Sequence, residues 1–98
     1  SGKATKGKKT ADESALAVNL EAAEEVAVQL RLRNISGMIL IDFISMKSEE
    51  HMNQVMDRLR EAVKYDPVKT VVVDMTGLGL VEVTRKKVRK PLHEIVTA

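Results

Sequence analysis

Two aspartates in this chain of 98 residues could take part in chemistry, because each interrupts or follows an apolar run. Asp42 lies within Gly37–Met46, where seven of ten residues are large and apolar, and Asp74 follows the β-branched run Thr70–Val73. A run that barely alternates is typical of a strand buried on both faces. A buried carboxylate is costly unless it is paired, hydrogen-bonded or bound to a metal. Asp42 therefore either lies near an exposed strand end or serves chemistry.

The two carboxylates occupy matching places on two predicted strands. In open α/β sheets, ligands gather beyond the carboxyl ends of the strands, and Mg²⁺ is commonly held by one or two carboxylates with water and substrate phosphates. Asp42 and Asp74 are thus a candidate metal pair. The alternative is structural, since strand-end acids also cap helices or pair with lysine, and the pattern does not decide between the two. Phe43, Ile44 and Met46 continue the apolar run, so Asp42 is not expected to end its strand.

Other kinds of catalytic site find no support in the sequence. His51 and His93 have no nucleophile in a recognisable motif around them, and no glycine-rich phosphate loop follows a strand. The chain has no cysteine, which excludes a disulfide framework or a cysteine zinc site within it and fits a cytoplasmic location. No apolar run approaches the roughly 18 residues of a membrane span. The first ten residues are basic without an apolar core, unlike a secretory signal.

Periodicity predicts two helices. Apolar residues recur at helical spacing over about 17–33, with Asn19 as the N-cap and Ser14 as a rival cap. A second helix over about 48–65 follows the i, i+3, i+4, i+7 template throughout and stops before Pro67.

The order strand, helix, strand predicts an α/β fold. Strands over about 37–46 and 70–75, joined by a helix, form a βαβ unit, so we expect the two strands to be parallel in a small sheet. The stretch 80–88 fits a short helix or a strand, and we favour a helix because the residues after 85 continue the pattern.

Charge divides the chain into three parts. Residues 1–13 are expected to form a basic flexible arm and 91–98 a tail, around a folded domain at 14–90. Basic side chains cluster in the arm and again near the end of the domain, where they either attract phosphates or form solvated surface. The candidate phosphate contacts are Lys3, Lys6, Lys8, Lys9, Arg85, Lys86 and Lys87.

Several long motifs resemble one known family, in the right order and over nearly the whole chain. They are residues 19–34 (NLEAAEEVAVQLRLRN), 37–46 (GMILIDFISM), 58–62 (RLREA), 78–87 (LGLVEVTRKK) and the opening 1–8 (SGKATKGK). They resemble the catalytic core of the ribonuclease E/G family. The opening segment resembles the stretch just after the first catalytic aspartate of that family.

This resemblance implies a DNase I-like subdomain with single-strand-specific endoribonuclease chemistry. In that family two aspartates and an asparagine hold one Mg²⁺, which activates water for attack on an RNA phosphodiester. Asp42 matches the second aspartate, the basic clusters become candidate RNA-backbone contacts, and Asp74 matches no metal ligand of the family. Ser45 stands where a further aspartate is common. Val28 stands where arginine is common, which removes one possible salt bridge or RNA contact.

The resemblance also implies that the first aspartate and the asparagine lie upstream of Ser1, and a zinc-binding link downstream of Leu92. We therefore expect these 98 residues to bind one Mg²⁺ weakly, to hold no zinc and to cleave RNA poorly by themselves. The parent protein would be a cytoplasmic endoribonuclease acting on single-stranded RNA. The alternative is a non-catalytic RNA-binding or interaction module of the same family. An exposed sheet edge and apolar face favour a homodimer or higher homo-oligomer.

Overall fold

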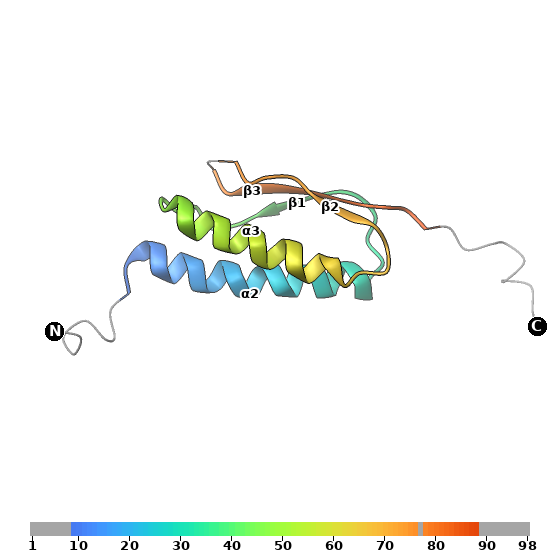
Figure 1. Ribbon diagram of the computed structural model, residues 1–98, viewed down its shortest axis with the longest axis horizontal. Helices are drawn as coiled ribbons and strands as arrows, with labels where there is room; N and C mark the ends of the chain where they lie inside the picture. The colour runs from blue at the N-terminus through green and yellow to red at the C-terminus, as the bar shows by residue number, and fades with distance from the viewer. Residues whose placement is uncertain (1–8, 77, 89–98) are drawn as a thin grey trace, which may run out of the picture.

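The computed structural model describes residues 9–76 and 78–88, and its helices and strands form two layers (Figure 1). In order, the elements are α2 (Ala11–Leu32), β1 (Gly37–Asp42), α3 (Glu49–Lys64), β2 (Thr70–Val72) and β3 (Leu80–Arg85). The three strands form one sheet, and the two helices lie side by side against one of its faces. The predicted α/β class is confirmed. Within the described ranges, no helix is long and apolar enough to cross a membrane.

The first helix, α2, begins at Ala11 and not near residue 17. Thr10 is its N-cap: the Thr10 hydroxyl accepts a hydrogen bond from the Glu13 N–H, and the Thr10 N–H donates to the Glu13 carboxylate, both at 3.0 Å. This reciprocal pair is a capping box, which satisfies two otherwise unpaired N–H groups. Residues 11–13 therefore belong to the helix, and the prediction of a flexible arm over them is wrong.

The end of α2 and the whole of α3 agree with the sequence. Asn34 has a φ of 50°, and the Ile35 N–H bonds back to the Leu30 carbonyl at 3.0 Å, a common way to end a helix. The N-cap of α3 is Ser48, whose hydroxyl accepts from the His51 N–H at 3.2 Å. The side chains of α3 that face the core are Val55, Met56, Leu59 and Val63.

The sheet order is β1–β3–β2, and both ladders are antiparallel. The prediction of a parallel sheet over 37–46 and 70–75 is therefore corrected: β1 and β2 point the same way, but β3 lies between them and pairs antiparallel with both. The favoured helix over 80–88 is wrong: Leu80–Arg85 is a strand. Its buried Val81 and Val83 alternate with residues that face outward, the period of two that a half-buried strand requires.

Strand β1 is buried on one face only, so the prediction of a strand buried on both faces is wrong. Ile41 faces the helices and is 8% exposed, whereas Leu40 is 65% exposed. The strand also ends at Asp42, opposite Leu80 of β3. Apolar residues on an exposed face hide the alternation in the sequence. We call this surface the outer sheet face; its apolar members are Met38, Leu40, Val71, Val73 and Leu80.

Candidate functional site

Asp42 lies at the last position of β1, on the outer sheet face. Successive strand residues point to opposite faces, so its side chain shares a side with Leu40 and Met38 while Ile41 points inward. Asp42 is exposed, and its carboxylate forms no hydrogen bond or ion pair with any other described residue. The carboxylate is therefore open to a cation from solvent. It carries no burial cost, which agrees with the alternative of an exposed strand end, although the strand was expected to continue past Asp42.

The backbone directly after Asp42 is held against β3. The Phe43 N–H donates to the Gly79 carbonyl at 3.0 Å, and the Phe43 side chain is 3% exposed. Gly79 has a φ of +88°, and a Cβ there would lie 2.6 Å from the Phe43 carbonyl oxygen. Only glycine suits this position, because any side chain would collide with the backbone next to Asp42.

On the helix side, the same segment is held by Asn19. The Asn19 Nδ2 donates to the Ile44 carbonyl at 2.8 Å, and the Asn19 Oδ1 accepts from the Ile44 N–H at 2.9 Å. Asn19 is 1% exposed and lies in the middle of α2, so it is not the N-cap that the sequence suggested. The sequence contained a sign of this buried position, because Asn19 falls four residues from Ala15 and from Ala23, within the buried stripe of the helix.

A second tether joins the start of α2 to the start of α3. Asp12 accepts hydrogen bonds from the N–H groups of Lys47 at 2.7 Å and Ser48 at 3.1 Å, and His51 Nδ1 lies 2.9 Å from its Oδ2. The Lys47 N–H bond is the main reason that the pKa of Asp12 lies below its ordinary value. Asp12 thereby fixes the far end of the loop that follows Asp42. This role had no signal in the sequence beyond the acid in the first turn.

The structure does not place Asp74 next to Asp42. Their strands flank β3 on opposite sides, so they lie roughly 10 Å apart, two strand spacings. Asp74 forms an ion pair with Arg60 of α3. The structure thus favours the structural alternative for Asp74. Across the described ranges, no group of three or more His, Cys, Asp or Glu side chains is placed to hold a metal ion.

Those basic candidates that the structure describes do not form one surface. Lys86 and Lys87 are exposed and follow β3 at the end of the sheet opposite to Asp42, since Arg85 pairs with Gly37. The length of β1, about 17 Å, separates the two ends. Lys9 is exposed just before α2, whose first turn contacts the loop after Asp42. Lys3, Lys6 and Lys8 lie outside the described residues.

Arg85 is buried and is therefore not available to RNA. Its side chain is 3% exposed, its Nε and Nη2 donate to the two oxygens of Asp66 at 2.8 and 3.1 Å, and its Nη1 donates to Asn34 Oδ1 and to the Ile35 carbonyl. The bonds from Arg85 lower the pKa of Asp66 below its ordinary value. The sequence placed Arg85 among surface charges because of its basic neighbours, but the strand alternation turns it inward.

A groove of about 410 Å³ lies between β1 and α2 and includes Asp42 in its lining. The strand is at the edge of the sheet here, so a further strand could pair with it. The groove is mainly apolar; its lining residues are Ala22, Glu25, Val26, Gln29, Leu30, Ile35, Ile39, Leu40, Ile41 and Asp42.

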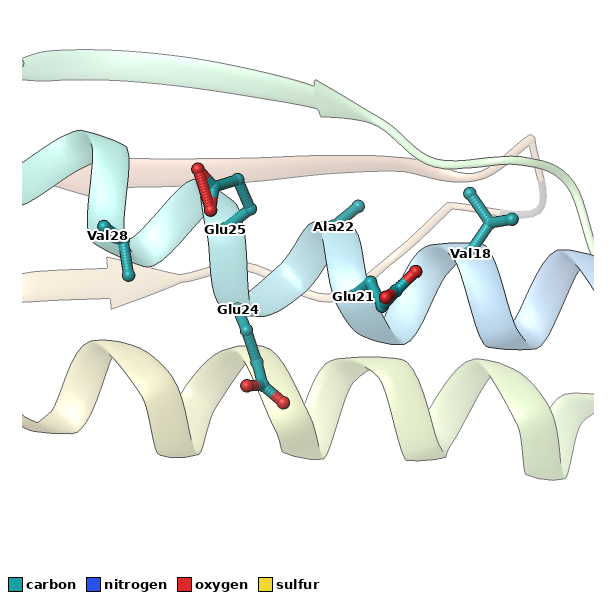
Figure 2. A pocket seen from close by; sticks show the side chains of 6 residues that line it. All are labelled: Val18, Glu21, Ala22, Glu24, Glu25 and Val28. Atoms are coloured by element: carbon teal, nitrogen blue, oxygen red, sulfur yellow. The ribbon is translucent and has the colours of Figure 1, made fainter.

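A second hollow over α2 is acidic (Figure 2). Its lining consists of Val18, Glu21, Ala22, Glu24, Glu25 and Val28, and Glu24 forms an ion pair with Arg58 of α3. Three carboxylates would repel an RNA phosphate, so this side of α2 does not suit an RNA backbone. Val28 lies within one helical turn of Glu24 and Glu25, where an arginine could pair with them.

Comparison with known proteins gives a consistent result. The model of the Ribonuclease E/G family matches residues 1–88. Ribonuclease G of Escherichia coli K12 is 42% identical over 90 residues, which cover 92% of this chain and 18% of that protein. Ribonuclease E of Nostoc sp. PCC 7120 is 44% identical over 86 residues, covering 88% of this chain and 12% of that protein. The chain thus spans less than a fifth of the length of these relatives.

Proposed function

Because this chain belongs to the ribonuclease E/G family, we propose that it forms part of a Mg²⁺-dependent endoribonuclease that cleaves single-stranded RNA in the cytoplasm. The observation that carries the proposal is the state of Asp42: an exposed carboxylate at the end of β1, without a partner among the described residues. Asp42 is the residue we assign to the metal.

The chain's own residues hold the backbone next to this carboxylate in place. Phe43 is bonded to Gly79 and Ile44 to Asn19, so the backbone after Asp42 is restrained from both sides. The Ser45 hydroxyl donates to the Leu78 carbonyl at 3.2 Å, which gives this residue a structural use in place of a ligand's role. A bound Mg²⁺ would supply a water of lowered pKa as the nucleophile.

A single carboxylate makes a weak binding site for Mg²⁺. Mg²⁺ is usually held by one or two carboxylates together with waters and phosphates, and Asp42 supplies one. We propose that the remaining ligands come from residues outside these 98, on a segment that pairs with the open edge of β1 next to Asp42. The 98 residues alone would then bind Mg²⁺ feebly and cleave RNA poorly.

The test compares RNA cleavage with Mg²⁺ by residues 1–98 and by a longer chain that includes the segment upstream of Ser1. We expect cleavage by the longer chain only. In that chain, Asp42→Asn should reduce the rate by more than the 10–100-fold typical of outer-shell partners, whereas Asp74→Asn should leave it near the wild-type value. Equal cleavage by the short and long chains, or an active Asp42→Asn variant, would contradict the proposed site.

The same assays address the alternative, a non-catalytic RNA-binding module. The exposed Lys86 and Lys87, remote from Asp42, could bind an RNA backbone without any metal. RNA affinity that does not depend on Mg²⁺, with no cleavage by the longer chain, would favour that alternative.

Self-association is a further part of the proposal. The outer sheet face presents five exposed apolar side chains, and it is bordered by an edge of β1 that no other described strand pairs with. Such surfaces commonly mark contacts with other protein. We propose that the isolated 98 residues form a homodimer or higher homo-oligomer through this face.

A further inference from the structure

We propose that Asn19 is a positioning residue for Asp42. By binding both backbone groups of Ile44, Asn19 sets the course of the chain as it leaves β1, and with it the direction of the Asp42 carboxylate. The inference rests on the proposed role of Asp42 as a metal ligand. It adds to the site a residue of α2 that contacts neither the metal nor RNA.

The placement of Asn19 is costly unless its amide is used. Asparagine is a poorer helix former than alanine, and burying an amide without partners is unfavourable. At 1% exposure, both amide atoms are satisfied by one residue, Ile44, at 2.8 and 2.9 Å. Asn19 shares the buried side of α2 with three small residues, Ala15, Ala23 and Ala27. Their short side chains let the helix lie close to the sheet layer. The amide thus acts in place of a strand partner.

The Asn19 amide takes over this hydrogen bonding at the point where the ladder between β1 and β3 ends. Pairing of β1 with β3 ends at Asp42 and Leu80, with one further bond from the Phe43 N–H to Gly79. Both backbone groups of Ile44 are bonded by α2 instead. Asp42 is therefore the last residue of the regular strand and is followed two residues later by the Asn19 contact.

Asp12 holds the same loop farther along, at Lys47 and Ser48. Lys47 is five residues beyond Asp42, so the influence of Asp12 on the Asp42 carboxylate is less direct. The two bonds from Asn19 are nearer to Asp42 along the chain than those from Asp12. Metal ligands must be held within roughly 0.5 Å of the productive geometry, and losing a residue that orients a ligand typically lowers metal affinity or activity 10–100-fold.

The test uses the full-length protein that contains these residues. It compares wild type, Asn19→Ala, Asn19→Ser, Asp42→Asn and the control Val63→Ala. Val63 is a core residue of the last turn of α3, whose carbonyl accepts from the Asp66 N–H at the end remote from Asp42. All proteins are measured at a temperature at which circular dichroism shows them folded. The readouts are Mn²⁺ affinity by calorimetry without RNA, the Mg²⁺ concentration at half-maximal cleavage, and KM for RNA.

We expect Asn19→Ala to raise the Mn²⁺ dissociation constant and the half-saturating Mg²⁺ concentration by about 10-fold or more, with KM unchanged. Val63→Ala should lower stability and leave both metal values unchanged. If Asn19→Ala does not fold, Asn19→Ser, which keeps a polar group at the site, gives the same comparison.

Two results separate the possible failures. If Asp42→Asn loses Mn²⁺ binding while the Asn19 variants bind within twofold of wild type, Asn19 is only structural and the inference is overturned. If Asp42→Asn itself binds Mn²⁺ and cleaves RNA as wild type does, the proposed function of Asp42 fails, and Asn19 has no ligand to position.

Discussion

Arg85 and Asp66 form a bidentate ion pair with side chains that are 3% and 0% exposed. The pair joins the end of β3 to the turn after α3, and the remaining Arg85 nitrogen bonds to Asn34 and Ile35 in the loop between α2 and β1. One guanidinium therefore ties three segments together at the end of the sheet remote from Asp42.

Breaking this pair should be strongly destabilising. Arg85→Met leaves the Asp66 carboxylate buried without its partner, a change that typically costs about 3–5 kcal/mol. Urea denaturation should show the loss as a lower midpoint. The double variant Arg85→Met/Asp66→Leu removes both charges and should recover most of the stability; a single variant as stable as wild type would contradict the burial of the pair.

Acid should weaken the fold through Asp66. Its pKa is lower in the folded chain than in the unfolded one, chiefly because of Arg85. The unfolded state therefore binds more protons, and stability rises with pH in this range. The contribution is complete above the unfolded value of about 3.9 and is lost as pH falls towards the folded value. Thermal melts across this range should show a steeper loss for wild type than for Arg85→Met/Asp66→Leu.

Gly79→Ala should cost more stability than Gly37→Ala. Both glycines have a positive φ, +88° and +89°, so both substitutions strain the backbone. A Cβ at Gly79 would also lie 2.6 Å from the Phe43 carbonyl oxygen, whereas nothing lies within 4 Å at Gly37. We expect each change to cost more than about 1 kcal/mol, and the difference in unfolding free energy to report the collision beside Asp42. Equal costs would contradict it.

Lys86 and Lys87 should contribute to RNA affinity through charge. The double change Lys86→Ala/Lys87→Ala should weaken binding to single-stranded RNA and flatten its salt dependence by about 0.7 per lysine. Lys64→Ala is the control, because Lys64 pairs with Glu61 on the outside of α3. Fluorescence titrations at several salt concentrations would give the slope of RNA affinity against salt for the wild type and for each variant. An unchanged slope in the double variant would mean that RNA does not bind at Lys86 and Lys87.

The outer sheet face should drive self-association of the isolated chain. Leu40→Lys introduces a charge on the most exposed side of this face, next to the edge of β1, and we expect it to shift sedimentation towards the monomer. Leu32→Lys is the matched control, since Leu32 is 74% exposed at the end of α2, away from this face. A wild-type chain that is monomeric at high concentration would refute the proposal.

The sequence was informative where the signal is local. The period of the Met and Val stripe in α3 and the break at Asn34 depend on neighbours within one helical turn. Family membership was also readable, because motifs such as that around Asp42 keep their order along the chain. The capping box of Thr10 and Glu13 is equally local, but the apolar periodicity favoured a helix start at Asn19.

Only the tertiary structure decided the rest, because it depends on partners far apart in the chain. The sheet order requires β3 to enter between β1 and β2, which no short window can show. The basic neighbours of Arg85 predict surface charge, whereas its position opposite Gly37 and its ion pair with Asp66 show that it is buried. The sequence alone determined the two helices, the family and the choice of Asp42 as the carboxylate of interest. Its exposure, and its support by Gly79 and Asn19, arise from contacts across 25 or more residues, and such contacts exist only once the layers have packed.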